Sequence, residues 1–329
     1  MLRGQRFVVG ARGGGSSFPA AGKGRTVSGP MPSVVTRSTP AARALSGSAA
    51  VRIVAEAVAF RLRGLEMANL AGAVSIALAL RLPWTEVAIR TLFAFVLNAL
   101  VYLNNDWFDA EDDLRAPGRD GAKTRFLAEH MESALAAQVA LAGLLVLAAL
   151  AFDPGLLVAL LVGGGTCVWY SRSLKRLPYV DVLAMAAWGV GMPMCGFPLD
   201  RMLGWCLALQ LGAFAAVYET IQVMRDAPAD TIAGIRTSGV VLGVDRTRRL
   251  SRALMVVASV LAAAVLHPLA GLASAAALLV PLDGTDVARR WTQVKAIYAA
   301  AWLFAIAWIW LTGASAGLLW SIAATPAQP

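Results

Sequence analysis

Long runs without a charged side chain restrict what this sequence can fold into. Residues 134–152, 155–171, 182–199 and 202–217 contain no Asp, Glu, Lys or Arg. Each run approaches the roughly 20 residues that a helix needs to cross a bilayer. A soluble protein of this length could bury one or two such helices, but not a whole series of them. We therefore predict a multi-pass membrane protein, in line with a mean hydropathy of +0.64 and a charged fraction of only 15%.

The apolar segments predict an all-α fold, a transmembrane bundle of about nine helices. The expected spans are 64–82, 86–104, 134–152, 155–171, 180–198, 202–222, 251–267, 268–283 and 296–315. The seventh and eighth spans share one long apolar run, which we divide at His267-Pro268 because proline ends or kinks a helix.

Basic residues predict the orientation of these spans. With the N-terminus inside, the inner segments are 1–63, 105–133, 172–179, 223–250 and 284–295, and they hold nearly all of the 29 Lys and Arg. This asymmetry follows the positive-inside rule. It accounts for the net charge of +9 without a nucleic-acid partner. We expect a bacterial cytoplasmic membrane, or alternatively an organelle inner membrane, with membrane lipid as the surroundings and the acidic motifs on the cytoplasmic side.

The N-terminal segment differs from the rest of the chain. Residues 1–55 are rich in Gly, Ser and Arg and contain no acidic residue, so we expect a disordered basic segment before a membrane domain at 56–325. Such a composition also resembles an organelle transit peptide. The alternative is a reading frame begun too far upstream, with Met31 as a second start.

Two segments at predicted inner helix ends carry acidic side chains at helical spacing. The first acidic stripe comprises Asn105, Asp106, Asp109 and Asp113, and the second comprises Glu219, Gln222, Asp226 and Asp230. The spacings place each stripe on one helical face. Clustered carboxylates repel one another unless cations share the site, and Mg²⁺ typically binds a few carboxylates together with substrate phosphates. The stripes therefore predict a metal-dependent phosphate site, although acidic loops that merely face solvent remain the alternative.

Basic side chains near these stripes are candidates for binding an anionic substrate. They are Lys123, Arg125, Lys175, Arg176 and Arg236. A phosphate ligand held by metal ions on one side commonly meets Lys or Arg on the other. Each of these residues could instead serve only the positive-inside asymmetry.

These motifs resemble the UbiA superfamily of intramembrane prenyltransferases. Asn105-Asp106-x-x-Asp109-x-x-x-Asp113 is similar to its first aspartate motif, and the segment from Tyr218 to Asp230 is similar to its second. The loop from Tyr170 to Arg176 resembles its Tyr-Lys element, and the likeness is nearest to the 4-hydroxybenzoate polyprenyltransferase type. Two departures stand out: Glu219 replaces an expected Asp, and Phe126 rather than Pro follows Arg125.

The resemblance implies a helical bundle with a central cavity that opens to lipid, and two Mg²⁺ ions replaceable by Mn²⁺. It implies a catalytic role for Asp106, Asp109, Asp113, Asp226, Asp230 and Lys175. The implied metal ligands are Asn105, Asp106, Asp109, Asp113, Glu219, Asp226 and Asp230. The implied substrate-binding residues are Asn105, Lys123, Arg125, Tyr170, Lys175, Arg176, Tyr218, Gln222 and Arg236.

The implied reaction transfers a prenyl group from an allylic prenyl diphosphate to an aromatic or other lipophilic acceptor, with release of diphosphate. A terpene cyclase and a phosphoribosyl transferase acting on polyprenyl phosphate are alternatives within the superfamily. A divalent-cation-coupled transporter is an alternative of another class. Transporters usually bind their ions near the bilayer midplane, whereas the acids here lie at helix ends, so the sequence favours an enzyme.

Overall fold

The computed structural model describes residues 46–63, 67–115, 121–283 and 286–319. The chain divides into the units Met1–Pro40 and Ala41–Pro329, and all described residues belong to the second. This unit is helical, without a strand among the residues described. Its α-helices are α1 (Gly47–Arg63), α2 (Ala68–Ala79), α3 (Trp84–Arg115), α4 (Ala122–Glu129), α5 (Met131–Phe152), α6 (Leu156–Ala159), α7 (Gly165–Arg172), α8 (Val180–Gly191), α9 (Met202–Ala233), α10 (Ser238–Leu242), α11 (Val244–Val265), α12 (Pro268–Ala275) and α13 (Val287–Thr312). Short helical turns cover Leu160–Gly164, Leu174–Arg176, Pro193–Gly196 and Ala276–Leu279.

Each of the predicted spans falls on a helix. Among the described residues, four helices are long and apolar enough to cross a membrane by themselves, namely α3, α5, α9 and α13. Leu156–Arg172, Val180–Gly196 and Pro268–Leu279 are shorter apolar helices. The all-α membrane bundle expected from the sequence is therefore confirmed.

The lengths of α3 and α9 differ from the expected spans in a way that matters for the site. Both helices have 32 residues and continue past the predicted ends at 104 and 222. Both acidic stripes therefore lie on helices that extend out of the apolar span. Because each helix is continuous through its stripe, the side chains of that stripe lie on one helical face, as the sequence pattern predicts.

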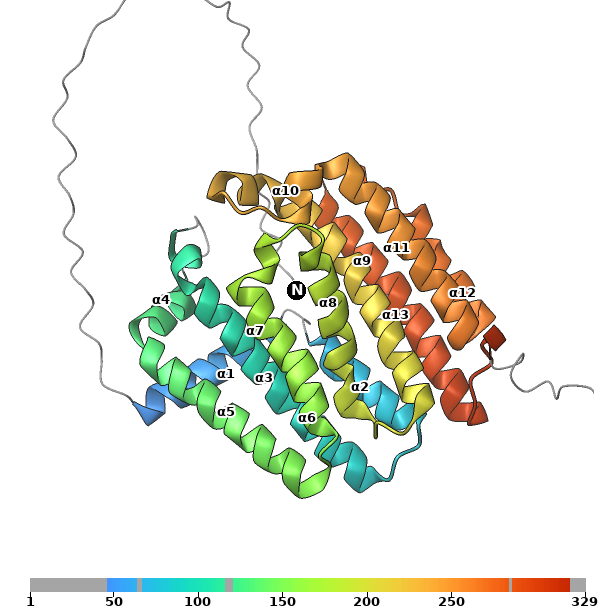
Figure 1. The fold of residues 1–329 in the computed structure, drawn as a ribbon, viewed down its shortest axis with the longest axis horizontal. Coiled ribbons are helices and arrows are strands. Elements are labelled where there is room, and N and C mark those ends of the chain that lie inside the picture. Colours follow the sequence, from blue (N-terminus) through green and yellow to red (C-terminus); the bar gives the residue numbers. More distant parts are fainter. Residues whose placement is uncertain (1–45, 64–66, 116–120, 284–285, 320–329) are drawn as a thin grey trace, which may run out of the picture. The chain divides into compact units, whose positions relative to one another are not determined.

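Helix α9 is at the centre of one group of neighbours. Figure 1 shows α9 between α8 on one side and α11 and α13 on the other, and all three contact it. The main apolar core lies between α9 and these neighbours and extends to α2 and α3. It includes Ile76, Leu97, Ile221 and Met255.

Glycines allow α8 to approach the helix that contains α7. A Cβ on Gly191 would lie 2.5 Å from the backbone nitrogen of Gly163, and a Cβ on Gly163 would lie 2.9 Å from the Gly191 carbonyl carbon. Small residues permit such backbone contact between membrane helices. Gly163 therefore serves close helix packing, whereas Gly165 has open space around it, and a π-helical turn covers Leu160–Gly164 where this helix contacts α8.

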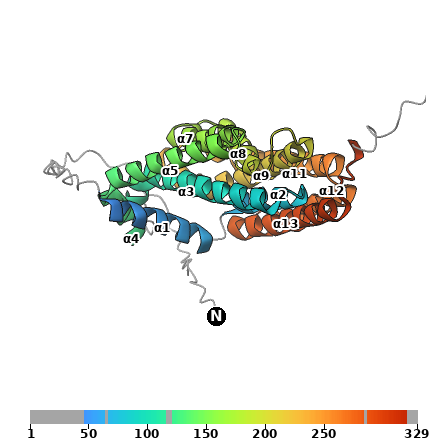
Figure 2. The ribbon, with the colours of Figure 1, turned by 90° about the horizontal axis from the view of Figure 1, so that it is seen from below.

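Helix α1 begins before the expected domain boundary. Residues 47–55 were expected to be disordered, but they form the first half of α1, and Ala49, Ile53 and Ala57 are buried. Figure 2 shows α1 and α4 beside α3, and both helices contact it. A second, smaller core joins Ile53 to Leu103, Leu127 and Ala134. Residues 1–45 lie outside the described residues, so the rest of that expectation remains a prediction.

Candidate active site

Asp106, the first aspartate of the first stripe, is held by cations from two other helices. Arg61 of α1 donates to its Oδ1 at 2.9 Å, and Lys123 of α4 lies 2.6 Å from its Oδ2. The Asp106 side chain is only 11% exposed. The Arg61 guanidinium also lies 4.8 Å from the centre of the Tyr102 ring, on the same face of α3. α1 and α4 thus supply the counter-ions of this carboxylate.

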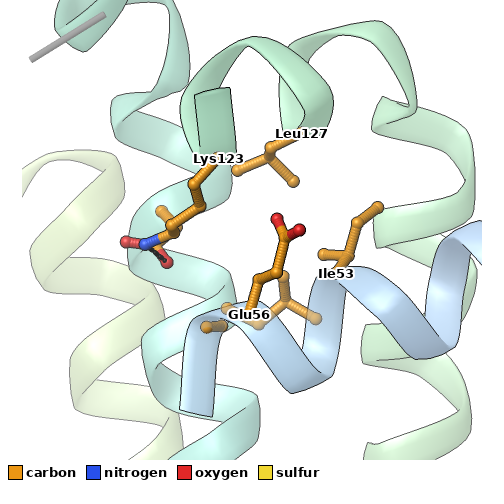
Figure 3. A pocket seen from close by; sticks show the side chains of 7 residues that line it. Ile53, Glu56, Lys123 and Leu127 are labelled. Atoms are coloured by element: carbon orange, nitrogen blue, oxygen red, sulfur yellow. Dashed lines mark ion pairs between the residues drawn. The ribbon is translucent and has the colours of Figure 1, made fainter. Parts of the chain in front are cut away.

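A small hollow adjoins this ion pair. Its cavity volume is about 10 Å³, and it is lined by Ile53, Glu56, Ala57, Leu103, Asp106, Lys123 and Leu127. Figure 3 shows Glu56 of α1 reaching into the hollow toward Leu127 of α4, with Lys123 at its edge. This hollow lies between α1, α3 and α4. The central cavity implied by the resemblance is a different feature and remains a prediction.

Asp109 lies one turn further along the same face and joins α3 to the loop after α7. The Lys175 ammonium group binds its Oδ1, and the Asn105 amide donates to its Oδ2 at 3.0 Å. Asn105 also donates to the Ser171 hydroxyl at 3.4 Å. The structure therefore brings Asn105, Asp109 and Lys175 together from two elements that are 66 residues apart in sequence.

The far end of the first stripe is more open. Asp113 is partly buried, and Arg176 lies 3.9 Å from Asp112, a residue outside the predicted face. Both members of that pair are more than half exposed. An exposed ion pair at this distance contributes little to stability, so Arg176 is not held in place as Lys175 is.

On α9, Glu219 is the buried acid of the second stripe. It is 4% exposed, and the Tyr170 hydroxyl of α7 donates to its Oε1 at 2.7 Å. Asp226 is held at both oxygens by the guanidinium of its neighbour Arg225, at 2.8 Å each. Asp230 accepts a hydrogen bond from the Thr237 hydroxyl at 3.1 Å.

The Tyr170–Glu219 pair links the two stripes. Asp109 lies within electrostatic reach of Tyr170, and Asp226 lies within reach of Glu219. Helix α7 contacts α3 on one side and α8 on the other, and α8 contacts α9. The sequence placed both stripes at one membrane level, and the structure adds α7 as the element between them.

The acidic side chains fit Mg²⁺ by their chemistry but are not gathered around one ion. Among the residues that the structure describes, no group of three His, Cys, Asp or Glu side chains lies close enough to hold a metal. Instead, Asp106 and Asp109 are paired with Lys and Arg. Mg²⁺ usually keeps several waters and takes only one or two carboxylates plus phosphate oxygens, so carboxylates spread over two helices suit an ion that arrives with a diphosphate.

The remaining predicted site residues differ in their exposure and contacts. Arg125 and Arg236 are exposed, and Gln222 is half-buried. Tyr218 packs against Tyr298 of α13, with ring centres 5.9 Å apart, and Tyr298 stacks on Phe214. Tyr218 thus belongs to an aromatic cluster between α9 and α13.

Two residues of this region were not predicted from the sequence. Arg61 precedes the first span and was counted only among the inner basic residues, and Asp181 lies off both stripes. Asp181 is fully buried at the start of α8 and within electrostatic reach of both Tyr170 and Glu219. A lone acid directly before an apolar span is the signal that could have drawn attention to Asp181.

Comparison with known proteins identifies the family. The family model of the UbiA prenyltransferase family matches residues 67–295, which is most of the chain. The chain belongs to the UbiA prenyltransferase family. It is therefore an integral, multi-pass membrane protein and a prenyltransferase by family. A search of curated protein sequences found no match.

Solved structures of the family share this fold. A UbiA homologue from Archaeoglobus fulgidus bound to DMAPP and Mg²⁺ is 17% identical, with a TM-score of 0.58 over 74% of this chain and 96% of that chain. The same homologue bound to GPP and Mg²⁺ covers 79% of this chain and 99% of its own, at 16% identity and a TM-score of 0.58. A digeranylgeranylglyceryl phosphate synthase is 14% identical, with a TM-score of 0.62 over 80% of this chain and 99% of that chain.

Proposed function

We propose that this protein transfers a prenyl group from an allylic prenyl diphosphate to an aromatic or other lipophilic acceptor, with Mg²⁺ as cofactor. The observation that carries the proposal is the link from Asp109 through Asn105, Ser171 and Tyr170 to Glu219, which joins both acidic stripes across α7. The relatives bound to DMAPP or GPP with Mg²⁺ support the same ligand pair. The family match supports the reaction class.

Asp106 and Asp109 on α3, and Glu219, Asp226 and Asp230 on α9, are the residues that would hold Mg²⁺. The bound ions would act as Lewis acids on the departing diphosphate. Carboxylates that bind metal no longer need Lys123 and Lys175 as counter-ions. These ammonium groups are then available to the diphosphate oxygens, where they stabilise the negative charge that develops as the allylic C–O bond breaks.

We also infer that both stripes and Lys175 face the cytoplasm, because the basic residues concentrate on that side of the chain. A diphosphate is too strongly charged to cross the apolar core, so the substrate headgroup would meet the site from this aqueous side while its prenyl chain stays among the helices. The bacterial cytoplasmic membrane remains the proposed location.

The decisive experiment is turnover of geranyl diphosphate by purified protein with a panel of aromatic and lipophilic acceptors, with product masses read directly. We expect chelation of Mg²⁺ to abolish turnover and Mn²⁺ to restore it. Asp109→Asn should reduce kcat about a hundredfold or more, as removal of transition-state charge stabilisation commonly does. Glu111→Gln is the matched control, because Glu111 is exposed and lies off the stripe, and it should stay near wild type.

Three results would contradict this reading. Turnover that survives chelation would exclude a metal-dependent site, and equal damage from Glu111→Gln would exclude the assignment of the face. Diphosphate release with a cyclic product and no acceptor would replace transfer by cyclisation.

A further inference from the structure

A single buried carboxylate joins the start of α8 to the segment after α9. Asp181 is 0% exposed. Its Oδ1 accepts hydrogen bonds from the Val182 amide at 2.8 Å and the Ser238 hydroxyl at 2.5 Å, and its Oδ2 accepts one from the Ser238 amide at 2.7 Å. Two of these three donors are backbone amides. Asp181 thus anchors the backbone of two segments.

Ser238, the first residue of α10, extends the connection in both directions. Its hydroxyl oxygen accepts from the Tyr179 amide at 2.7 Å, at a position where Tyr179 has φ of 67°. A positive φ is unfavourable for a bulky residue and persists only when surrounding contacts hold it. The preceding residue, Thr237, donates to Asp230 of the second stripe. We name the bonds among Asp181, Ser238 and Tyr179 the Asp181–Ser238 latch.

The latch has little room to move. A Cβ on Gly239 would lie 2.0 Å from the carbonyl oxygen of Val223, so the start of α10 rests directly on the backbone of α9. Any shift of Ser238 must therefore displace α9 or break the latch. This packing makes the latch a fixed spacer between α8 and the end of α9.

The two segments that the latch joins carry opposite parts of the site. The segment before α8 carries Lys175, which binds Asp109 of the first stripe. The segment after α9 carries Thr237, which binds Asp230 of the second stripe. The separation between the Lys175 loop and the second stripe therefore depends on the latch.

We propose that Asp181 is a positioning residue that sets the spacing between Lys175 and the carboxylates of α9. The proposal rests on the proposed function, because that spacing matters only if one diphosphate–metal unit binds both. Without the latch every reacting group is still present, and the Tyr170–Glu219 hydrogen bond still links α7 to α9, but the Lys175 loop loses its connection to the segment that follows α9. Loss of the latch should thus weaken the binding of substrate and metal more than it lowers kcat, the turnover rate of the bound complex.

Two variants remove the latch in different ways. Asp181→Asn keeps the side-chain volume but replaces one acceptor oxygen by an NH₂ group. That group would then face the backbone amide of Val182 or Ser238, which is also a donor. Ser238→Ala removes the bonds of the hydroxyl and leaves the backbone amide. For each, we expect the KM for geranyl diphosphate and the half-saturating Mg²⁺ concentration to rise about tenfold, the effect of losing roughly one hydrogen bond to a charged group. We expect kcat to stay within about twofold.

The two substitutions remove overlapping bonds, so the double variant should be much less than additive. Amide hydrogen exchange in 174–182 and 235–242 should rise in both segments together. The matched control is Asp153→Asn, since Asp153 also binds an arginine and a backbone amide, at the junction of α5 and α6. It should lower thermal stability and leave the KM for geranyl diphosphate unchanged.

An unchanged KM in folded Asp181→Asn protein overturns the proposal, as does faster exchange in only one of the two segments. If Asp181→Asn does not fold, Ser238→Ala decides by the same criteria. Absence of turnover by the wild-type protein would overturn the proposed function instead, and the exchange measurement would still show whether the latch couples the two segments.

Discussion

Asp106→Asn separates the two roles that the structure gives to this carboxylate. Asp106 is the counter-ion of Arg61 and Lys123, at 2.9 and 2.6 Å, and it is also a proposed metal ligand. The substitution keeps the side-chain volume and removes the charge. Both cations, which are 17% and 26% exposed, then lose their partner.

The cost follows from this geometry. Two unit charges about 3–4 Å apart attract by roughly 4–5 kcal/mol at an effective dielectric constant near 20. Desolvation and partial exposure reduce the net value to about 1–2 kcal/mol for each pair. Two pairs together predict a loss of about 2–4 kcal/mol in the free energy of unfolding. Turnover should fall about a hundredfold, since a charge that stabilises the transition state is lost.

A second substitution distinguishes the roles. Asp106→Asn/Lys123→Gln removes one of the stranded cations, so it should recover roughly half of the lost stability, as measured by thermal unfolding in detergent. It should recover none of the turnover, because the proposed metal ligand is still absent. Glu56→Gln is the control, since Glu56 lines the same hollow and forms an exposed ion pair with Arg52 at 2.8 Å. Turnover that returns in the double variant would reduce Asp106 to a counter-ion and refute the reasoning.

Three further outcomes are expected. Tyr170→Phe removes the hydroxyl that donates to buried Glu219 at 2.7 Å, and it should raise the half-saturating Mg²⁺ concentration severalfold in a turnover assay; an unchanged value would show that Tyr170 does not support metal binding. Gly191→Ala should destabilise by about 1–3 kcal/mol in thermal unfolding, because its Cβ would strike backbone, whereas Gly165→Ala, with nothing within 4 Å, should be neutral or better. A cysteine at exposed Thr231, in a cysteine-free background, should resist impermeant reagents added outside intact cells; ready labelling would reverse the proposed orientation.

The positions of the helices could be read from the sequence because the signal is local. A run of about 20 apolar residues must satisfy its backbone hydrogen bonds internally in lipid, which leaves a helix as the outcome whatever its neighbours are. The same holds for the acidic stripes, since the helical period alone places Asp106, Asp109 and Asp113 on one face. The start of α1 at Gly47, before the expected boundary, has no comparable local signal: α1 is mixed in composition, and its burial against Leu103 and Leu127 depends on α3 and α4.

The sequence by itself thus determined that the chain is a membrane bundle, that two acidic stripes exist and that their chemistry suits a divalent cation with a diphosphate. Only the tertiary structure decided which donor meets which carboxylate. Arg61 pairs with Asp106, Lys175 pairs with Asp109, and the Tyr170 hydroxyl donates to Glu219. It also decided that Asp181, an isolated acid in the sequence, anchors Ser238 of a distant segment. The physical reason is that periodicity fixes the face on which a side chain lies, whereas its partner depends on which helices come into contact, and that depends on the packing of the whole bundle.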